Sequence, residues 1–123
     1  MNRDQNVRSI RPELDLKNKN TLPIEKFQNE TLRPILKLQH ELTQFLLLNH
    51  QNYNAIRILK PKEKQYETAL KKFIQTNIEF KNQLLGAVIG QFTHAELTFY
   101  MNHRKEINKR IMQMQLNRYF DSL

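Results

Sequence analysis

The sequence predicts an all-α fold of four to five helices, preceded by an extended basic arm. Its 123 residues include only two glycines and four prolines, too few for the turns of a β-protein. Leu, Lys, Gln and Glu, which are good helix formers, are abundant. Apolar residues after position 23 recur every three to four positions, the spacing of one helix face. A chain of this length fits a single helical domain, which we place at residues 24–123.

Residues 1–23 differ from the rest of the chain, because they lack a sustained helical period and contain few large aliphatic residues. Pro12 and Pro23 resist continuation of a helix on either side. We therefore expect residues 1–23 to form an extended arm, and residues 24–123 to fold without it. The arm carries five cationic side chains: Arg3, Arg8, Arg11, Lys17 and Lys19.

Pro34 interrupts an otherwise helical pattern between positions 24 and 50. A proline inside a helix costs about 3 kcal/mol, but a proline in the first turn costs little. If Thr31 caps a new helix, Pro34 falls in that first turn. The sequence thus predicts a short helix at 24–30, a longer one at 32–50, and a further short helix within 53–60.

Residues 62–90 carry an apolar seam with alternating spacings of four and three. Its members are Tyr66, Leu70, Phe73, Asn77, Phe80 and Leu84. This seam predicts one continuous amphipathic helix. Gly86 and Gly90 indicate either a close contact between helices or a helix that ends at Gly90.

The last third of the chain predicts two helices. Thr93 and Glu96 form a capping-box signature, so a helix should begin there and run to about Met101. Asn102 can cap a final helix from 103 to about 121. That helix carries two apolar stripes on different faces, which predicts either a central position or contact with a partner. The stripes are Ile107, Ile111 and Met114, and Met112, Leu116, Tyr119 and Leu123.

Charge is the strongest indication of function. Twenty Lys and Arg against twelve Asp and Glu give a net charge of +8 and a pI near 9.9, which favours polyanionic partners. We expect RNA to be that partner, bound through phosphate contacts rather than base reading. Besides the five arm residues, the candidate RNA-binding residues are Arg57, Lys60, Lys62, Lys64, Lys71, Lys72, Arg104, Lys105, Lys109 and Arg110.

The sequence offers little for catalysis, and we expect neither a metal, a cofactor nor a small-molecule substrate. Cysteine is absent, the histidines lack metal-ligand spacing, and both serines are terminal. A helical ribonuclease that uses Arg33 and His40 is a remote enzymatic alternative. The N-terminus lacks the apolar run of a signal peptide, and the most hydrophobic stretch, Phe45 to Leu48, is too short to cross a bilayer. We therefore expect a cytoplasmic location without membrane contact.

Four segments carry residue patterns that are shared with other proteins: Phe27 to Lys37, Ile78 to Asn82, Gly86 to Gly90 with Phe92 and Thr93, and Ile107 to Met112. Over about residues 25–115 these segments resemble a family of short bacterial proteins, some of which are labelled glyoxalase. A glyoxalase would require His and Glu metal ligands on strands, which this helical pattern does not provide, so we reject that activity. Members of the family often have Asn at the position of His40, which argues against the ribonuclease. The basic helical body with its basic arm also resembles a lineage-specific accessory protein of the large ribosomal subunit.

These observations predict a non-enzymatic RNA-binding protein. We expect it to associate with the ribosome, where it would contact ribosomal RNA and neighbouring ribosomal proteins. The alternative is a helical adaptor or homodimer that uses the two apolar faces of its last helix for protein–protein contact.

Overall fold

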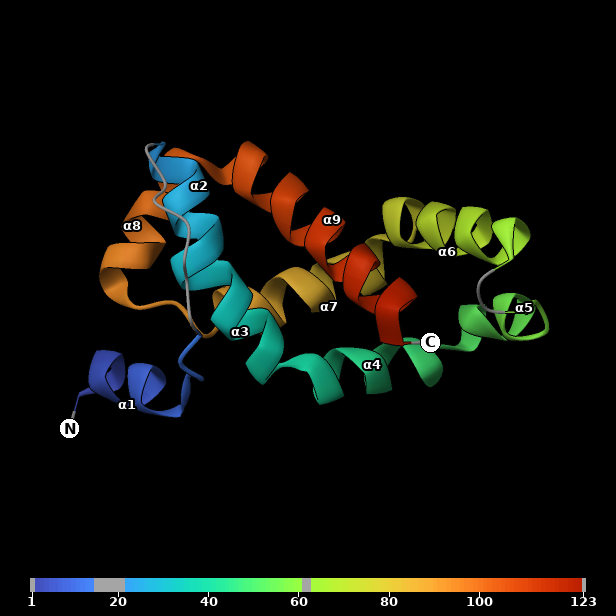
Figure 1. The fold of residues 1–123 in the computed structure, drawn as a ribbon, viewed down its shortest axis with the longest axis horizontal. Coiled ribbons are helices and arrows are strands. Elements are labelled where there is room, and N and C mark those ends of the chain that lie inside the picture. Colours follow the sequence, from blue (N-terminus) through green and yellow to red (C-terminus); the bar gives the residue numbers. More distant parts are fainter. Residues whose placement is uncertain (1, 15–21, 61–62, 123) are drawn as a thin grey trace.

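The computed structural model describes residues 2–14, 22–60 and 63–122, and within these ranges every regular element is helical (Figure 1). The helices are α1 (Arg3–Ile10), α2 (Pro23–Phe27), α3 (Arg33–Leu38), α4 (His40–Leu48), α5 (Asn54–Arg57), α6 (Lys64–Thr76), α7 (Ile78–Ile89), α8 (His94–Asn102) and α9 (Arg104–Ser122). The all-α class is confirmed. The expected count of four to five helices is wrong, because two of the expected long helices are each divided and the arm contributes a helix.

The elongated molecule has two apolar cores, and α9 runs between them (Figure 1). The first, the α6 core, contains Leu47, Tyr53, Ile56, Tyr66, Leu70, Phe73, Ile74, Phe80, Leu84, Leu116 and Tyr119. The second, the α8 core, contains Phe27, Leu32, Ile35, Leu36, Val88, Phe92, Tyr100, Ile107 and Ile111. Helices α7 and α9 contribute side chains to both cores.

Both apolar stripes of α9 pack against other helices of the same chain, which explains why this helix has two of them. Ile107 and Ile111 are fully buried in the α8 core, and Leu116 and Tyr119 are buried in the α6 core. Tyr119 also donates a hydrogen bond to the carbonyl of Thr43, at 2.7 Å, and so ties α9 to α4. The central position predicted for this helix is confirmed.

A π-helical turn just before Pro34 accommodates this proline, so no new N-terminal cap is needed there. Residues Gln28–Leu32 form this turn, and the N–H of Arg33 donates to the carbonyl of Gln28. The extra residue in the turn changes the hydrogen-bond register just before Pro34, which has no N–H to offer. The predicted cap at Thr31 is therefore wrong. Thr31 is buried inside the helix, and its hydroxyl donates to Glu96 at 3.0 Å.

The predicted continuous helix over 62–90 is divided at Asn77, which has an extended backbone (φ −84°, ψ 100°). The side chain of Asn77 accepts a hydrogen bond from the N–H of Phe80 at 3.0 Å, so it caps α7. The apolar seam members on both sides of the break are buried as expected. Helix α7 ends at Gly90, one of the two predicted roles of the glycine pair.

The expected helix start at Thr93 is confirmed, because Thr93 and Glu96 form a complete capping box at the start of α8. The expected cap at Asn102 is wrong. Asn102 lies at the end of α8, where its amide donates to the carbonyl of Thr98 at 3.1 Å.

Candidate nucleic-acid interface

The predicted extended arm is helical over Arg3–Ile10 and lies against the corner between α7 and α8. Helix α1 has a complete capping box at Asn2, and it buries Val7. Arg3 donates to the carbonyls of Phe92 and Gly90, at 2.6 and 2.9 Å. The extended arm is therefore a wrong prediction for these residues. The basic side chains hold this segment against the helical body, because they donate hydrogen bonds to acceptors there.

Arg11 forms the strongest of these contacts. Its guanidinium donates to both carboxylate oxygens of Glu96, at 2.8 and 2.9 Å, and to the carbonyl of Gln91 at 2.7 Å. Both side chains of the pair are about 90% buried. Burial alone would raise the pKa of Glu96, but the hydrogen bonds from Arg11, Thr93 and Thr31 outweigh it and hold that pKa below its ordinary value of 4.5.

These contacts correct the expectation that the arm cations are free to bind phosphates. Arg3 and Arg11 are engaged within the chain. Arg8 is exposed on α1, so its side chain can still contact a phosphate. Lys17 and Lys19 lie outside the described residues, as does Lys62 of the central basic segment.

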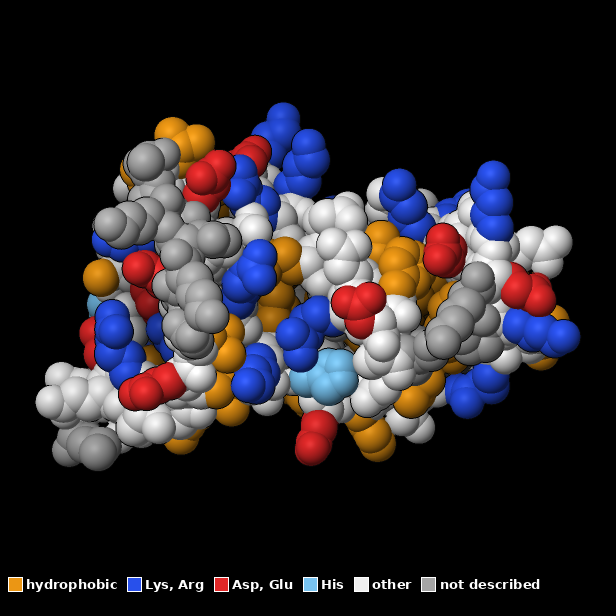
Figure 2. Space-filling model, viewed as in Figure 1, with side chains coloured by type: hydrophobic (Ala, Val, Ile, Leu, Met, Phe, Trp, Pro, Cys, Tyr) orange, Lys and Arg blue, Asp and Glu red, His pale blue; other side chains and the backbone are white. Residues whose placement is uncertain are grey.

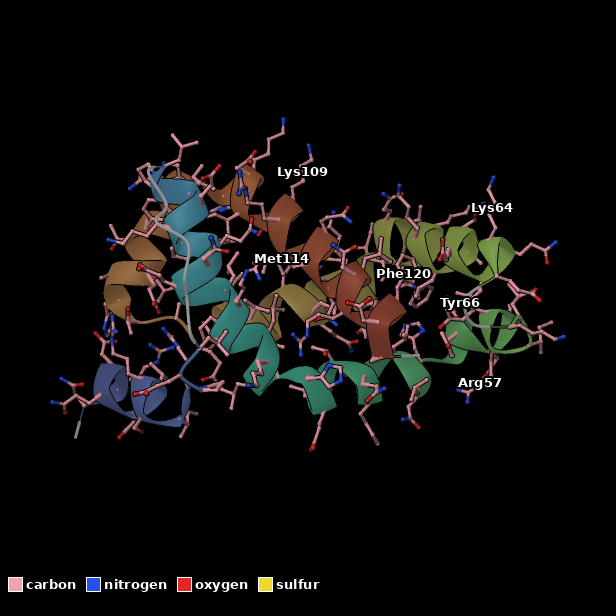
Figure 3. The ribbon with its side chains drawn as sticks, in the orientation of Figure 1. Arg57, Lys64, Tyr66, Lys109, Met114 and Phe120 are labelled. Carbon is pink, nitrogen blue, oxygen red and sulfur yellow. The ribbon has the colours of Figure 1, made fainter. Side chains whose placement is uncertain are left out.

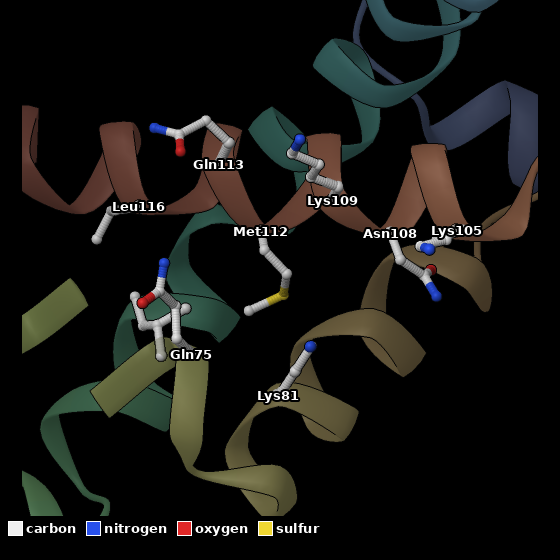
Figure 4. A pocket seen from close by; sticks show the side chains of 9 residues that line it. Gln75, Lys81, Lys105, Asn108, Lys109, Met112, Gln113 and Leu116 are labelled. Atoms are coloured by element: carbon white, nitrogen blue, oxygen red, sulfur yellow. The ribbon is translucent and has the colours of Figure 1, made fainter. Parts of the chain in front are cut away.

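A basic groove of about 390 Å³ lies between α9 and the junction of α6 with α7 (Figure 4). We call it the lysine groove. Lys81, Lys105 and Lys109 supply its positive charge, and its lining contains no carboxylate. Among the described residues none of these lysines forms an ion pair. Its lining residues are Ile74, Gln75, Lys81, Lys105, Asn108, Lys109, Met112, Gln113 and Leu116.

Helix α9 supplies most of the residues that line the lysine groove. Lys105, Lys109, Met112 and Leu116 recur at spacings of three and four, so they share one face of the helix. The hydroxyl of Tyr100 donates to Oδ1 of Asn108 at 2.7 Å. This bond occupies the carbonyl end of the amide and leaves its NH₂ group as a donor at the groove.

A stripe of lysines on α6 leads into the groove. Lys64, Lys71 and Gln75 lie within about 40° of one another on the helix, at 100° per residue. Both lysines are exposed, and Gln75 already belongs to the groove lining. Lys64 and Lys109 project from the same edge of the molecule (Figure 3), and Lys and Arg side chains follow this edge over α6 and α9 (Figure 2). Four of the predicted residues, Lys64, Lys71, Lys105 and Lys109, thus belong to one surface.

The other predicted cations are more scattered. Arg57 donates to the carbonyl of Leu48 and lies over the ring of Tyr53, 5.3 Å from its centroid. Arg110 is shared between Glu106 and Gln28, at 3.0 and 2.8 Å. Three more, Lys60, Lys72 and Arg104, are exposed but do not line the groove.

The sequence did not indicate four of the groove residues: Gln75, Lys81, Asn108 and Gln113. Lys81 is a single lysine between Phe80 and Asn82, and the other three are amides without charge. Only the packing of α6 and α7 against α9 brings them together. A search for polar residues at the spacing of Lys105 and Lys109 on α9 could have found Asn108 and Gln113.

The Arg33–His40 pair does not share a pocket. Arg33 faces Asn117 and Arg118 of α9, in a small pocket whose lining does not include His40. Within the described part of the chain, no cluster of three or more His, Asp or Glu side chains could hold a metal ion. None of the described helices combines the length and apolar character needed to cross a membrane.

No family model, curated protein or solved structure matches the chain.

Proposed function

We propose that the protein binds RNA without catalysing a reaction, through the lysine groove and the lysine stripe of α6. The observation that supports this most directly is the composition of the groove. Three lysines from two helices face one concave surface that has no carboxylate in its lining. Such a surface attracts phosphates, and each phosphate contact releases counterions.

The polar groups between the lysines favour a sugar–phosphate backbone over an isolated anion. Gln75, Asn108 and Gln113 can hydrogen-bond to phosphate oxygens and to ribose hydroxyls. The stripe from Lys64 to Lys71 extends the basic surface beyond the groove along α6. A backbone of several nucleotides can follow that line, whereas a small ligand would fill only the groove.

Ribosomal RNA is the RNA that we propose, with neighbouring ribosomal proteins as further contacts. A small basic helical body suits that environment, because its positive charge attracts the RNA backbone. The interaction-module alternative depended on a free apolar stripe of α9. Because Leu116 and Tyr119 are buried within the chain, that stripe no longer requires a partner.

Sucrose-gradient fractionation of a lysate from the native cell tests this proposal. The wild-type protein should sediment with ribosomal subunits at low salt. A Lys105→Gln/Lys109→Gln variant should shift toward the top of the gradient, because it removes two groove charges. A Lys26→Gln/Lys37→Gln control removes the same charge from exposed positions on α2 and α3 and should sediment like the wild type. Wild-type protein that stays at the top would contradict the ribosomal proposal.

A further inference from the structure

A second basic site lies across α9 from the lysine groove. Arg33, Leu36, Met114, Asn117 and Arg118 line a pocket of about 170 Å³ between α3 and α9. We call it the arginine pocket. On α9, residues 114 and 118 lie roughly opposite the face of Lys105 and Lys109, at 100° per residue, and residue 117 lies about 100° away from that face. The two sites therefore cannot be occupied by the same group.

The charges of the arginine pocket are not balanced within the described chain. Arg33 and Arg118 both line it, and neither forms an ion pair among the described residues. Asp121, one turn further along α9, does not pair with Arg118. The Nε atom of Arg118 is buried and has no hydrogen-bond partner in the described residues. A buried donor without a partner is costly, and two arginines at one pocket without a carboxylate in its lining leave room for one oxyanion to pair with both guanidiniums.

We propose that Arg33, Asn117 and Arg118 form a binding site for a single phosphate group. Two guanidiniums carry two positive charges, which match a phosphate monoester of charge about −1.5 to −2 better than a carboxylate of −1. The pocket is smaller than the roughly 300 Å³ at which sites for whole small molecules begin. It therefore holds the phosphate, while the remainder of the ligand lies outside. Leu36 and Met114 supply the apolar part of the pocket lining.

The phosphate has two possible sources, a free monoester or a phosphodiester within RNA. NMR titration of the isotope-labelled protein with inorganic phosphate, adenosine monophosphate and a short RNA with a 5′-hydroxyl separates them. Inorganic phosphate should produce saturable shifts at the amides of residues 33–36 and 114–118. If the monoesters saturate these amides and the RNA does not, the natural ligand is a monoester. If RNA also saturates them, the site accepts a backbone phosphate.

Two variants make the test specific. Arg33→Gln removes an exposed side chain and should weaken phosphate binding by about tenfold or more, as expected for loss of a charge-assisted contact. Arg118→Lys keeps the charge but loses the fork geometry, so it should weaken binding as well. Arg104→Gln, on the same helix but outside the pocket, should bind like the wild type. The absence of saturable shifts up to about 10 mM phosphate, where even a 1 mM site would be largely filled, would overturn the proposal. So would equal effects of Arg33→Gln and Arg104→Gln.

This inference does not depend on the RNA proposal. A variant without Lys105 and Lys109 retains the arginine pocket and should bind inorganic phosphate normally. Failure of RNA binding would therefore leave the phosphate result intact, and the reverse also holds.

Discussion

Replacing Arg11 by alanine tests whether α1 is an integral part of the fold. The substitution leaves Glu96 about 90% buried without its cationic partner. Removal of one partner from a buried ion pair costs about 3–5 kcal/mol. Glu96 keeps hydrogen bonds from the hydroxyl of Thr31 and the N–H of Thr93, so we expect the lower end, about 3 kcal/mol. This corresponds to a fall of about 10 °C in Tm for a domain of this size.

The effect should depend on pH in a defined direction. The pKa of Glu96 lies below its ordinary value of 4.5 in the folded protein, where burial opposes ionisation but the bonds from Arg11 and its neighbours outweigh it. Its ionised form therefore stabilises the fold above about pH 4.5, and this contribution is lost as the pH falls through the lowered pKa. The difference in unfolding free energy between wild type and Arg11→Ala should therefore shrink as the pH is lowered below about 4.5.

Urea denaturation followed by circular dichroism at neutral and acidic pH measures this difference. Arg8→Ala is the matched control, because Arg8 is an exposed cation on the same helix. It should change the unfolding free energy by less than about 0.5 kcal/mol. If Arg11→Ala resembles Arg8→Ala at neutral pH, the docking of α1 contributes nothing to the free energy of unfolding, and residues 1–23 would be the dispensable arm that the sequence predicts.

Three further changes test other parts of the account. Asn77→Ala should destabilise the protein by about 1 kcal/mol in urea, because α7 loses its cap, whereas Asn77→Asp should be nearly neutral; equal losses would exclude capping. Tyr119→Phe should cost about 1–1.5 kcal/mol in the same assay, since the buried carbonyl of Thr43 loses its donor. A neutral result there would mean that the contact does not tie α9 to α4. Gly90→Ala should lower Tm, because an added Cβ would lie 3.0 Å from the carbonyl oxygen of Gly86; an unchanged Tm would contradict that crowding.

The helical class and the buried residues could be predicted because they depend on local periodicity. The seam from Tyr66 to Leu84 is buried as its spacing indicates, and the capping box at Thr93 is formed. Helix boundaries were less predictable, because Asn77 fits a seam position and a cap equally well. Thr31 matches a capping signature, yet its hydroxyl binds Glu96, 65 residues away in the sequence.

The candidate site could be predicted only where its residues are close in the sequence. Lys105 and Lys109 are one turn apart on one helix, and Lys64 and Lys71 are two turns apart on another. Lys81 joins them only through the packing of α7 against α9. The docking of α1 had no local signal at all, because Arg11 and Glu96 are separated by 85 residues.

The salt dependence of RNA binding tests the central proposal most directly. Fluorescence anisotropy with a labelled single-stranded RNA gives the slope of log affinity against log salt for the wild type, Lys105→Gln/Lys109→Gln and Lys26→Gln/Lys37→Gln. If both groove lysines contact phosphates, the slope should fall by about 1.4, at roughly 0.7 for each contact. The control should keep the wild-type slope. Equal slopes for all three proteins, or no measurable binding by the wild type at low salt, would contradict the assignment of RNA to the lysine groove.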